Sequence, residues 1–230
     1  MLWMMLALLG WGDAPRPYTA FLRDVVNLER LTEPPLPGAT CKQFSSYDRR
    51  SRIDPDTGQF VDWDANGDAG NFLREDDEGH VLAEMEGPGC IVRIWSANPQ
   101  GRLKLFVDGA LALEVDFLAL ARGEVPGIPE PLVGLHARGA NCYLPIPYQK
   151  SCRLVVQDPG PLYYHVDYWT FPPETEVEPF HWPLREEEQR VLEEVLETLR
   201  RAGQPPHRYE GEKTYTGQVA LAPEEEVEWL

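Results

Sequence analysis

Residues between positions 44 and 95 include the side-chain types that recognise sugars. Two segments stand out, SSYDRRS at 45–51 and DWDANGDAGNF at 62–72, where carboxylates, amides, guanidinia and an indole alternate with glycines. Sugar hydroxyls need fixed donors and acceptors, and the apolar face of a sugar ring needs an aromatic surface. The pattern therefore indicates a carbohydrate-binding site that includes Asp48, Arg49, Arg50, Trp63, Asp64, Asn66, Asp68 and Asn71.

These polar residues also have a plainer interpretation. Aspartate, asparagine and glycine are common in surface loops because they form turns, so the second segment could be a set of Asx turns. In the first segment, Asp48 could form a structural salt bridge with Arg49 or Arg50. Otherwise the three residues form a charged wall in which an arginine donates to vicinal hydroxyls or fixes a carboxylate. Both interpretations stay open.

Besides Trp63, four aromatic residues are candidates for the same site or for catalysis. Trp63 and Trp169 lie beside loop signals and are the better candidates for stacking on a sugar ring. Trp95 lies in an apolar strand pattern and is expected in the core. His136 and His165 are isolated in the sequence, so no catalytic role is assigned to either.

The segment 64–75 has acidic or amide residues at the first, third, fifth and twelfth positions of a calcium loop. The sixth position, which needs glycine, is Ala69, and no flanking helices are predicted. We therefore predict no metal and no cofactor, with calcium in an oxygen-rich loop as the alternative. The 4 cysteines lack metal-binding spacing. Cys142 and Cys152 flank a turn and could face each other, or else be free buried thiols.

Paired carboxylates that could cleave a glycosidic bond occur in two predicted strands. Alternation along a strand places Glu84 with Glu86 on one face, and Glu114 with Asp116 on another. A retaining enzyme needs its two carboxyl groups about 5–5.5 Å apart, which a sequence does not reveal. Solvated sheet faces explain these pairs more simply, so the catalytic residues stay unassigned.

Composition excludes some classes of function. The chain has 230 residues, and its formal net charge of −17 would repel phosphates, so nucleic-acid binding is not expected. A hydrophobic content of 43% is enough for a core, and 22 prolines with 19 glycines indicate many turns. Residues 1–10 are apolar but too short to span a membrane. They are either an atypical signal peptide or a packed helix, so the compartment is undecided.

Short apolar runs between turns predict a mainly β fold. The spacing predicts a helix at 18–31, and Asp108-Gly109 predicts a tight hairpin turn. Residues 119–140 form the longest connection with little pattern. We expect an antiparallel jelly-roll β-sandwich with an N-terminal helix and a C-terminal connector helix. The predicted strands are 42–46, 80–86, 90–96, 103–107, 110–115, 141–146, 152–157 and 162–171.

A second helix at 183–203 is the clearest in the chain. Val191, Leu192, Val195, Leu196 and Leu199 form one apolar stripe, with three glutamates in the first turn and arginines in the last. We interpret it as a connector between sandwich domains, followed by a strand at 213–220. The predicted organisation is an apolar segment and helix at 1–38, a jelly roll at 39–182, the connector helix at 183–203 and the start of a second, truncated jelly roll at 204–230.

The order and spacing of several motifs make residues 40–170 resemble a known family. The motifs are SSYDR at 45–49, DANGDAGNF at 64–72, EGPGCIVRIW at 86–95, LFVDG at 105–109, NCYLPIP at 141–147 and the LYY to Tyr168 stretch that begins at Leu162. The chain resembles the N-terminal half of domain-of-unknown-function family 2961, placed in glycoside hydrolase family 172.

The resemblance implies two tandem jelly rolls, trimer-based homo-oligomers and retaining hydrolysis or transfer of furanosyl linkages such as fructofuranosides and arabinofuranosides. It also implies that the two catalytic glutamates lie in the second jelly roll, one of them near a Thr-Glu-Asp-Tyr-Phe-like motif that this sequence lacks. We therefore expect those glutamates beyond Leu230, and this chain alone to be inactive. The expected partner is a carbohydrate, with no nucleic acid and no membrane span. The alternatives are a non-catalytic carbohydrate-binding or oligomer-assembly module and a structural sandwich subunit.

Overall fold

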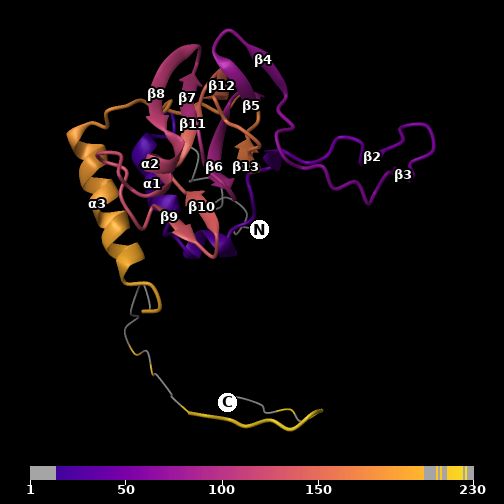
Figure 1. The fold of residues 1–230 in the computed structure, drawn as a ribbon. Helices are drawn as coiled ribbons and strands as arrows, with labels where there is room; N and C mark the ends of the chain where they lie inside the picture. Colours follow the sequence, from indigo (N-terminus) through magenta and orange to yellow (C-terminus); the bar gives the residue numbers. More distant parts are fainter. Residues whose placement is uncertain (1–13, 205–210, 212, 214–216, 225, 227–230) are drawn as a thin grey trace, which may run out of the picture.

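A computed structural model describes residues 14–204, 211, 213, 217–224 and 226. Two antiparallel sheets face each other in a sandwich (Figure 1). The first sheet has six strands in the order β1-β13-β6-β10-β9, with β11 also paired to β6. The second has five strands in the order β4-β5-β12-β7-β8, and β2 with β3 forms a small ribbon that extends away from the body. The mainly β, antiparallel sandwich predicted from the sequence is confirmed.

The strands of the first sheet are β1 (Thr40–Ser45), β6 (Gly89–Ser96), β9 (Val133–His136), β10 (Gly139–Cys142), β11 (Ile146–Tyr148) and β13 (Tyr164–Thr170). Those of the second are β4 (Arg74–Asp76), β5 (Gly79–Glu86), β7 (Arg102–Val107), β8 (Ala110–Asp116) and β12 (Ser151–Gln157). The ribbon consists of β2 (Arg52–Ile53) and β3 (Phe60–Val61). The helical elements are α1 (Tyr18–Asp24), the 3-10 turn η1 (Glu29–Thr32), α2 (Phe117–Ala121) and α3 (Glu186–Arg200).

The chain passes from one sheet to the other between β5 and β6, again between β6 and β7, and again between β12 and β13. Such repeated crossing is how a jelly roll places sequence neighbours in opposite sheets. The hairpin predicted at Asp108-Gly109 joins β7 to β8, with positive φ at both residues. The strand predicted at 141–146 was wrong in one respect, because Tyr143, Leu144 and Pro145 separate β10 from β11. Proline has no N–H to donate to a strand ladder, so the pairing breaks there.

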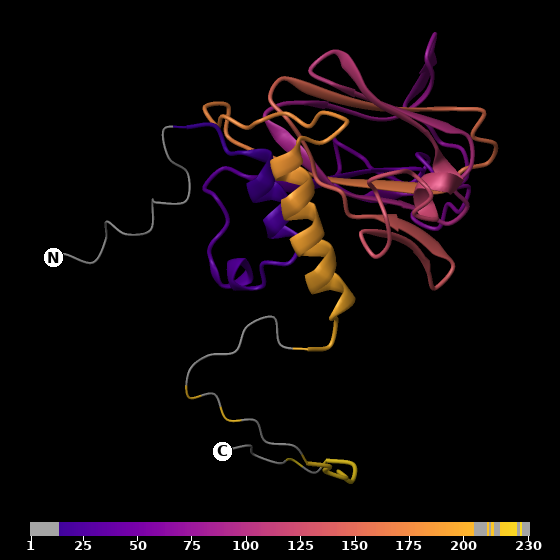
Figure 2. The same cartoon turned by 90° about the vertical axis from the view of Figure 1, so that its left-hand side faces the viewer.

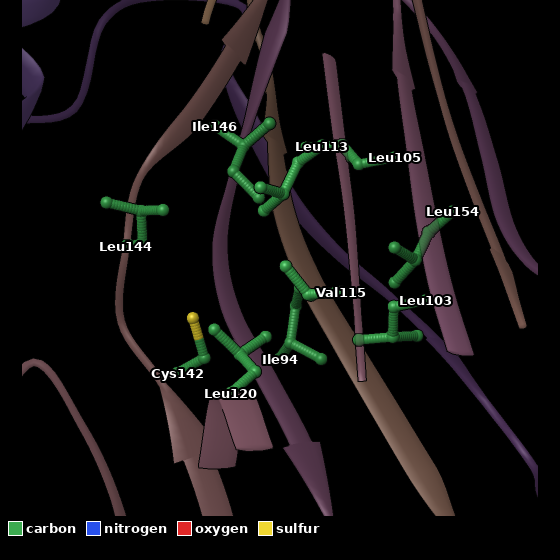
Figure 3. A pocket seen from close by; sticks show the side chains of 10 residues that line it. All are labelled: Ile94, Leu103, Leu105, Leu113, Val115, Leu120, Cys142, Leu144, Ile146 and Leu154. Atoms are coloured by element: carbon green, nitrogen blue, oxygen red, sulfur yellow. The ribbon is translucent and has the colours of Figure 1, made fainter. Parts of the chain in front are cut away.

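The interior between the two sheets is filled by aliphatic side chains. Figure 3 shows the group that encloses one small internal gap, from Leu103 and Leu105 on one sheet to Ile94 and Ile146 on the other. That gap measures about 20 Å³, and its lining is apolar. A water molecule in such a space would lack the two to four polar partners it needs. The sandwich interior is therefore a core and not a ligand pocket.

The N-terminal helix is shorter than predicted. Helix α1 ends at Asp24, and η1 follows after a break, because Leu28 and Leu31 are 57% and 82% exposed and continue no buried stripe. Asp24 instead bonds to both Arg16 and Arg30. The β-branched Val25 and Val26 also favour the break.

Helix α3 is confirmed and lies against α1 and the body (Figure 2). Most of its apolar stripe is buried. Its first turn is anchored by Glu188, which is 1% exposed. The Glu188 carboxylate accepts from the backbone N–H and the Nε of Arg185 at 2.7 and 2.9 Å, and lies 3.1 Å from Nε2 of His181. A buried polar network therefore fixes where this helix begins.

Some short elements were not predicted from the sequence. Helix α2 begins where Asp116 accepts a hydrogen bond from the N–H of Ala119 at 2.8 Å, an N-cap followed by only five residues. Strand β9 lies inside the connection 119–140. In the predicted strand 213–220, Lys213 and residues 217–220 are described and are not in a strand, and the rest lies outside the described residues.

The apolar segment 1–10 also lies outside the described residues. Among the residues that are described, no helix is long and apolar enough to cross a membrane. All four cysteines are free thiols, and Cys90, Cys142 and Cys152 are buried. Burial raises the pKa of Cys142 to about 11, so this thiol stays protonated at neutral pH.

Candidate functional site

The site begins where β1 leaves the first sheet. Ser46 is buried and exchanges two hydrogen bonds with Tyr164 on β13: its N–H donates to the Tyr164 carbonyl, and its Oγ accepts from the Tyr164 N–H, both at 3.1 Å. The loop after β1 is therefore fixed to a central strand of the sandwich. Asp48 follows two residues later at this end of the fold and is only 6% exposed.

The carboxylate of Asp48 is the centre of the loop. It accepts from the Nε of Arg50 at 3.0 Å, from the backbone N–H of Arg50 at 3.1 Å and from the N–H of Gly67 at 2.9 Å. The Arg50 guanidinium, followed by the Arg50 and Gly67 backbone N–H groups, holds the pKa of Asp48 well below the usual carboxyl range. Asp48 is therefore an anion throughout the physiological pH range and does not act as a general acid or base.

Gly67 is required at its position by close approach. A Cβ built there would lie 2.7 Å from Oδ2 of Asp48 and 3.4 Å from Nη2 of Arg50. Real Cβ atoms essentially never come within 3.0 Å of a heavy atom from another part of the chain, so any side chain at position 67 must displace the carboxylate. The segment 62–72 can therefore close over Asp48 only because it carries glycine there.

Asp68 and Asn71 stabilise the same loop. Oδ1 of Asp68 accepts from the N–H of Asp48 at 2.8 Å. The side-chain amide of Asn71 donates to the backbone carbonyls of Ser46 and Gly67 at 3.0 and 2.6 Å, and the backbone carbonyl of Asn71 accepts from the Tyr164 hydroxyl at 3.2 Å. Both residues hold the two segments together, which is the plainer of the two roles considered for them.

Three arginines line the same hollow as this fixed anion. Asp48, Arg49, Arg50, Arg52, Gly67 and Asn71 line an open hollow. Arg49 donates to the carbonyls of Tyr47 and Ser45 at 3.0 and 3.2 Å, and its guanidinium lies 4.9 Å from the centre of the Tyr47 ring. Arg52 was missed by the sequence analysis, although it follows the motif by one residue. The hollow therefore presents guanidinium donors in a chain whose formal net charge is −17.

The other predicted residues lie outside the lining of the hollow. Trp63 is 78% exposed, and Asp64 and Asn66 are also exposed. Among the described residues, neither Asp64 nor Asn66 makes a side-chain hydrogen bond. The pKa of Arg50 is raised mainly by its hydrogen bond to Asp48 and by the charge of Asp48, and to a smaller extent by the charges of Asp62 and Asp64. The side chains of Asp64 and Asn66 are thus available to a ligand, whereas those of Asp68 and Asn71 already form hydrogen bonds within the loop.

The remaining aromatic candidates differ from expectation. Trp169 belongs to a second apolar cluster with Phe171, and the guanidinium of Arg30 lies 4.7 Å from its ring centre. Trp95 is half-buried on the outer face of the first sheet and not in the core, because it alternates with Ile94, which points inward.

The paired carboxylates have structural partners. Glu84 bonds to Arg74 at 2.8 Å, Glu114 bonds to Arg102, and Asp116 caps α2, while Glu86 is exposed. Among the described residues, no group of three or more histidine, cysteine or acidic side chains is arranged to hold a metal ion. In the segment 64–75, Asp68 and Asn71 are already bonded within the loop.

These features define an antiparallel β-sandwich whose loops at one end present hydrogen-bonding groups. A family model, the GH172 first beta-sandwich domain, matches residues 37–188. The match covers most of the chain, which therefore belongs to glycoside hydrolase family 172 and contains its first β-sandwich domain.

No curated protein matches the sequence. One similar solved structure is the catalytic unit of the thermostable GH87 alpha-1,3-glucanase from Streptomyces thermodiastaticus strain HF3-3, at 17% identity and a TM-score of 0.25. The alignment covers 56% of this chain and 25% of that one, so the chain spans about a quarter of its length. A TM-score this low supports no argument about fold or function.

Proposed function

We propose that this chain is the N-terminal β-sandwich of a furanosidase-like glycoside hydrolase, and that the hollow at Asp48 contacts the sugar. The observation that carries the proposal is one hollow lined by three guanidinia and by a hydrogen-bonded carboxylate that is ionised at physiological pH. Donors in fixed positions suit the hydroxyls of a furanosyl unit, because they need no rearrangement when the sugar binds. The exposed Trp63 and Asp64 would complete the contact surface from the segment beside it.

The catalytic pair of the proposed enzyme is assigned to the other sandwich of the full-length protein. Asp48 is unsuitable as an acid because its pKa is held far below neutrality. The strand carboxylates Glu84 and Glu114 are already paired with arginines. The hollow is open, as expected of a surface that forms only one side of a substrate site. The connector role of α3 and trimer-based assembly belong to the same proposal.

Calorimetric titration of the purified chain with an inulin-type fructo-oligosaccharide and an arabino-oligosaccharide tests the proposal. Replacing Arg52 by alanine removes charged donors, so binding is expected to weaken by about tenfold or more. The matched control is Arg102→Ala, an exposed arginine on β7 that is paired with Glu114. Equal binding by both variants and the wild type would contradict the proposal. Hydrolysis of either sugar by this chain, lost when one of its own glutamates is replaced, would also contradict it.

A further inference from the structure

The outer face of the first sheet carries a row of residues that the hollow does not use. The strand register places His165 of β13 opposite Trp95 of β6, and Trp95 opposite Asn141 of β10, which in turn faces Gly134 of β9. The row thus crosses four neighbouring strands on one side of the sheet. Trp95 and His165 are half-buried, and their ring centres lie 4.7 Å apart.

Two glycines allow rings to lie against this sheet. A Cβ at Gly139 would lie 2.4 Å from Nε1 of Trp95, and a Cβ at Gly134 would lie 2.4 Å from Nε2 of His136. Each ring therefore occupies the space above a glycine on β10 or β9. An aromatic side chain on a strand ordinarily stands away from the sheet, so the glycines flatten this face.

The rings keep unused polar atoms. Among the described residues, neither the indole N–H of Trp95 nor a ring nitrogen of His165 is hydrogen-bonded. Burial lowers the pKa of His165, so its imidazole is neutral at pH 7 and offers one donor and one acceptor. A ligand that stacks on these rings would meet hydrogen-bonding groups at their edges.

A charge-balanced set of polar side chains borders the rings. Arg93 donates to Asp167 at 3.2 Å and to Oδ1 of Asn141 at 3.1 and 3.2 Å, and Gln43 donates to Asp167 at 2.6 Å. One positive and one negative charge cancel here, although the chain as a whole carries −17. Such a surface gives a charged ligand little attraction and offers a neutral one fixed donors and acceptors.

Two other aromatic rings on the sheets are covered by cations. The guanidinium of Arg153 lies 4.5 Å from the ring centre of Phe106 on the second sheet, and that of Arg30 lies 4.7 Å from the ring centre of Trp169. No guanidinium or ammonium group among the described residues stacks on Trp95. Its uncovered ring distinguishes Trp95 from Phe106 and Trp169.

We propose that this flat face, defined by Arg93, Trp95, His136, Asn141, His165 and Asp167, binds a neutral carbohydrate chain at a site separate from the Asp48 hollow. Sugar rings stack on Trp95, and their hydroxyls bond to Asn141, His165 and the Arg93–Asp167 pair. The ligand class rests on the proposed function, whereas the position of the site rests on the strand register and the two glycines.

The test is a heteronuclear NMR titration of the purified chain with inulin-type fructo-oligosaccharide and, for comparison, a cello-oligosaccharide. The indole N–H resonance of Trp95, assigned by its loss in Trp95→Phe, is expected to shift on saturation. Trp95→Ala and Asn141→Ala are each expected to weaken binding to this face about tenfold. Trp95→Phe should retain most of it, because a ring for stacking remains. The matched control is Phe106→Ala on the opposite sheet, which should bind as the wild type does.

The outcomes separate this site from the hollow. Sugar binding at the flat face that is lost in Trp95→Ala and retained in Arg52→Ala supports the proposal. A wild-type melting temperature for Asn141→Ala shows that its weaker binding is not caused by unfolding. Loss in Arg52→Ala alone, with the Trp95 resonance unmoved, overturns the flat face and leaves the proposed function standing. Sedimentation that shows copies of the chain dissociating in Trp95→Ala, with no response to sugar, would also overturn it. That result would identify an interface between copies.

Discussion

Replacing Gly67 by alanine tests how the candidate site is held together. The new Cβ would lie 2.7 Å from Oδ2 of Asp48, about 0.7 Å closer than an ordinary contact at 3.4 Å. A carboxylate displaced by that amount loses the 2.9 Å hydrogen bond from the Gly67 N–H and misaligns with Arg50. Overpacking of this kind costs about 1–3 kcal/mol. At roughly 2–4 °C per kcal/mol, the melting temperature should fall by several degrees.

The control is a double-mutant cycle with Asp48→Ala, which removes the atom that the new methyl group would strike. Gly67→Ala should cost much less in that background, with an interaction energy of about 1 kcal/mol or more. Urea unfolding followed by circular dichroism measures all four proteins. An equal cost in both backgrounds would refute the claim that the glycine is required by the Asp48 carboxylate.

Three more predictions concern individual carboxylates. The pKa of Asp48 is lower in the folded than in the unfolded protein. The ionised carboxylate therefore contributes fully to stability above the unfolded pKa of about 3.9, and this contribution is lost as pH falls through the lower folded pKa. The difference in melting temperature between the wild type and Asp48→Asn should therefore be full at pH 7 and narrow below about pH 4 in a thermal scan series. Asp68→Ala should lower stability by roughly 1 kcal/mol in urea because the Asp48 N–H loses its acceptor, whereas Asp64→Ala should melt normally and weaken sugar binding in calorimetry. Glu188→Ala should cost about 1–3 kcal/mol because the Arg185 N–H loses its acceptor, while the exposed Glu187→Ala should change stability by under about 0.5 kcal/mol. A small effect at both glutamates in urea unfolding would refute the anchoring role of Glu188.

The strand pattern could be predicted because apolar runs and turn residues are local signals. The positions of β5, β6, β7, β8 and β12 all follow from alternation and from their flanking turns. Pro145 also indicates the break between β10 and β11, but the apolar residues on either side of it led to the prediction of one continuous strand. The early end of α1 was not apparent, because Leu28 extends the helical spacing although it lies exposed in the fold.

The candidate site could be predicted only in part, since its roles depend on contacts between distant segments. Asp64 and Asp68 look equivalent in the sequence, yet only Asp68 reaches the N–H of Asp48. Arg52 has no feature that marks it apart from its neighbours, and it enters the hollow because the ribbon begins there. The pairing of Trp95 with His165 depends on strand register, which no short motif encodes.

The central claim is that the Asp48 hollow contacts a furanosyl sugar, and the most direct measurement is an amide chemical-shift map of the purified chain titrated with inulin-type fructo-oligosaccharide. The backbone N–H of Gly67 and the side-chain amide of Asn71 lie at the hollow and report on any ligand within it. Saturable shifts are expected at both groups, with a dissociation constant that Arg52→Ala raises by about tenfold or more. Unshifted resonances at Gly67 and Asn71, with the sugar at saturating concentration, would contradict the claim.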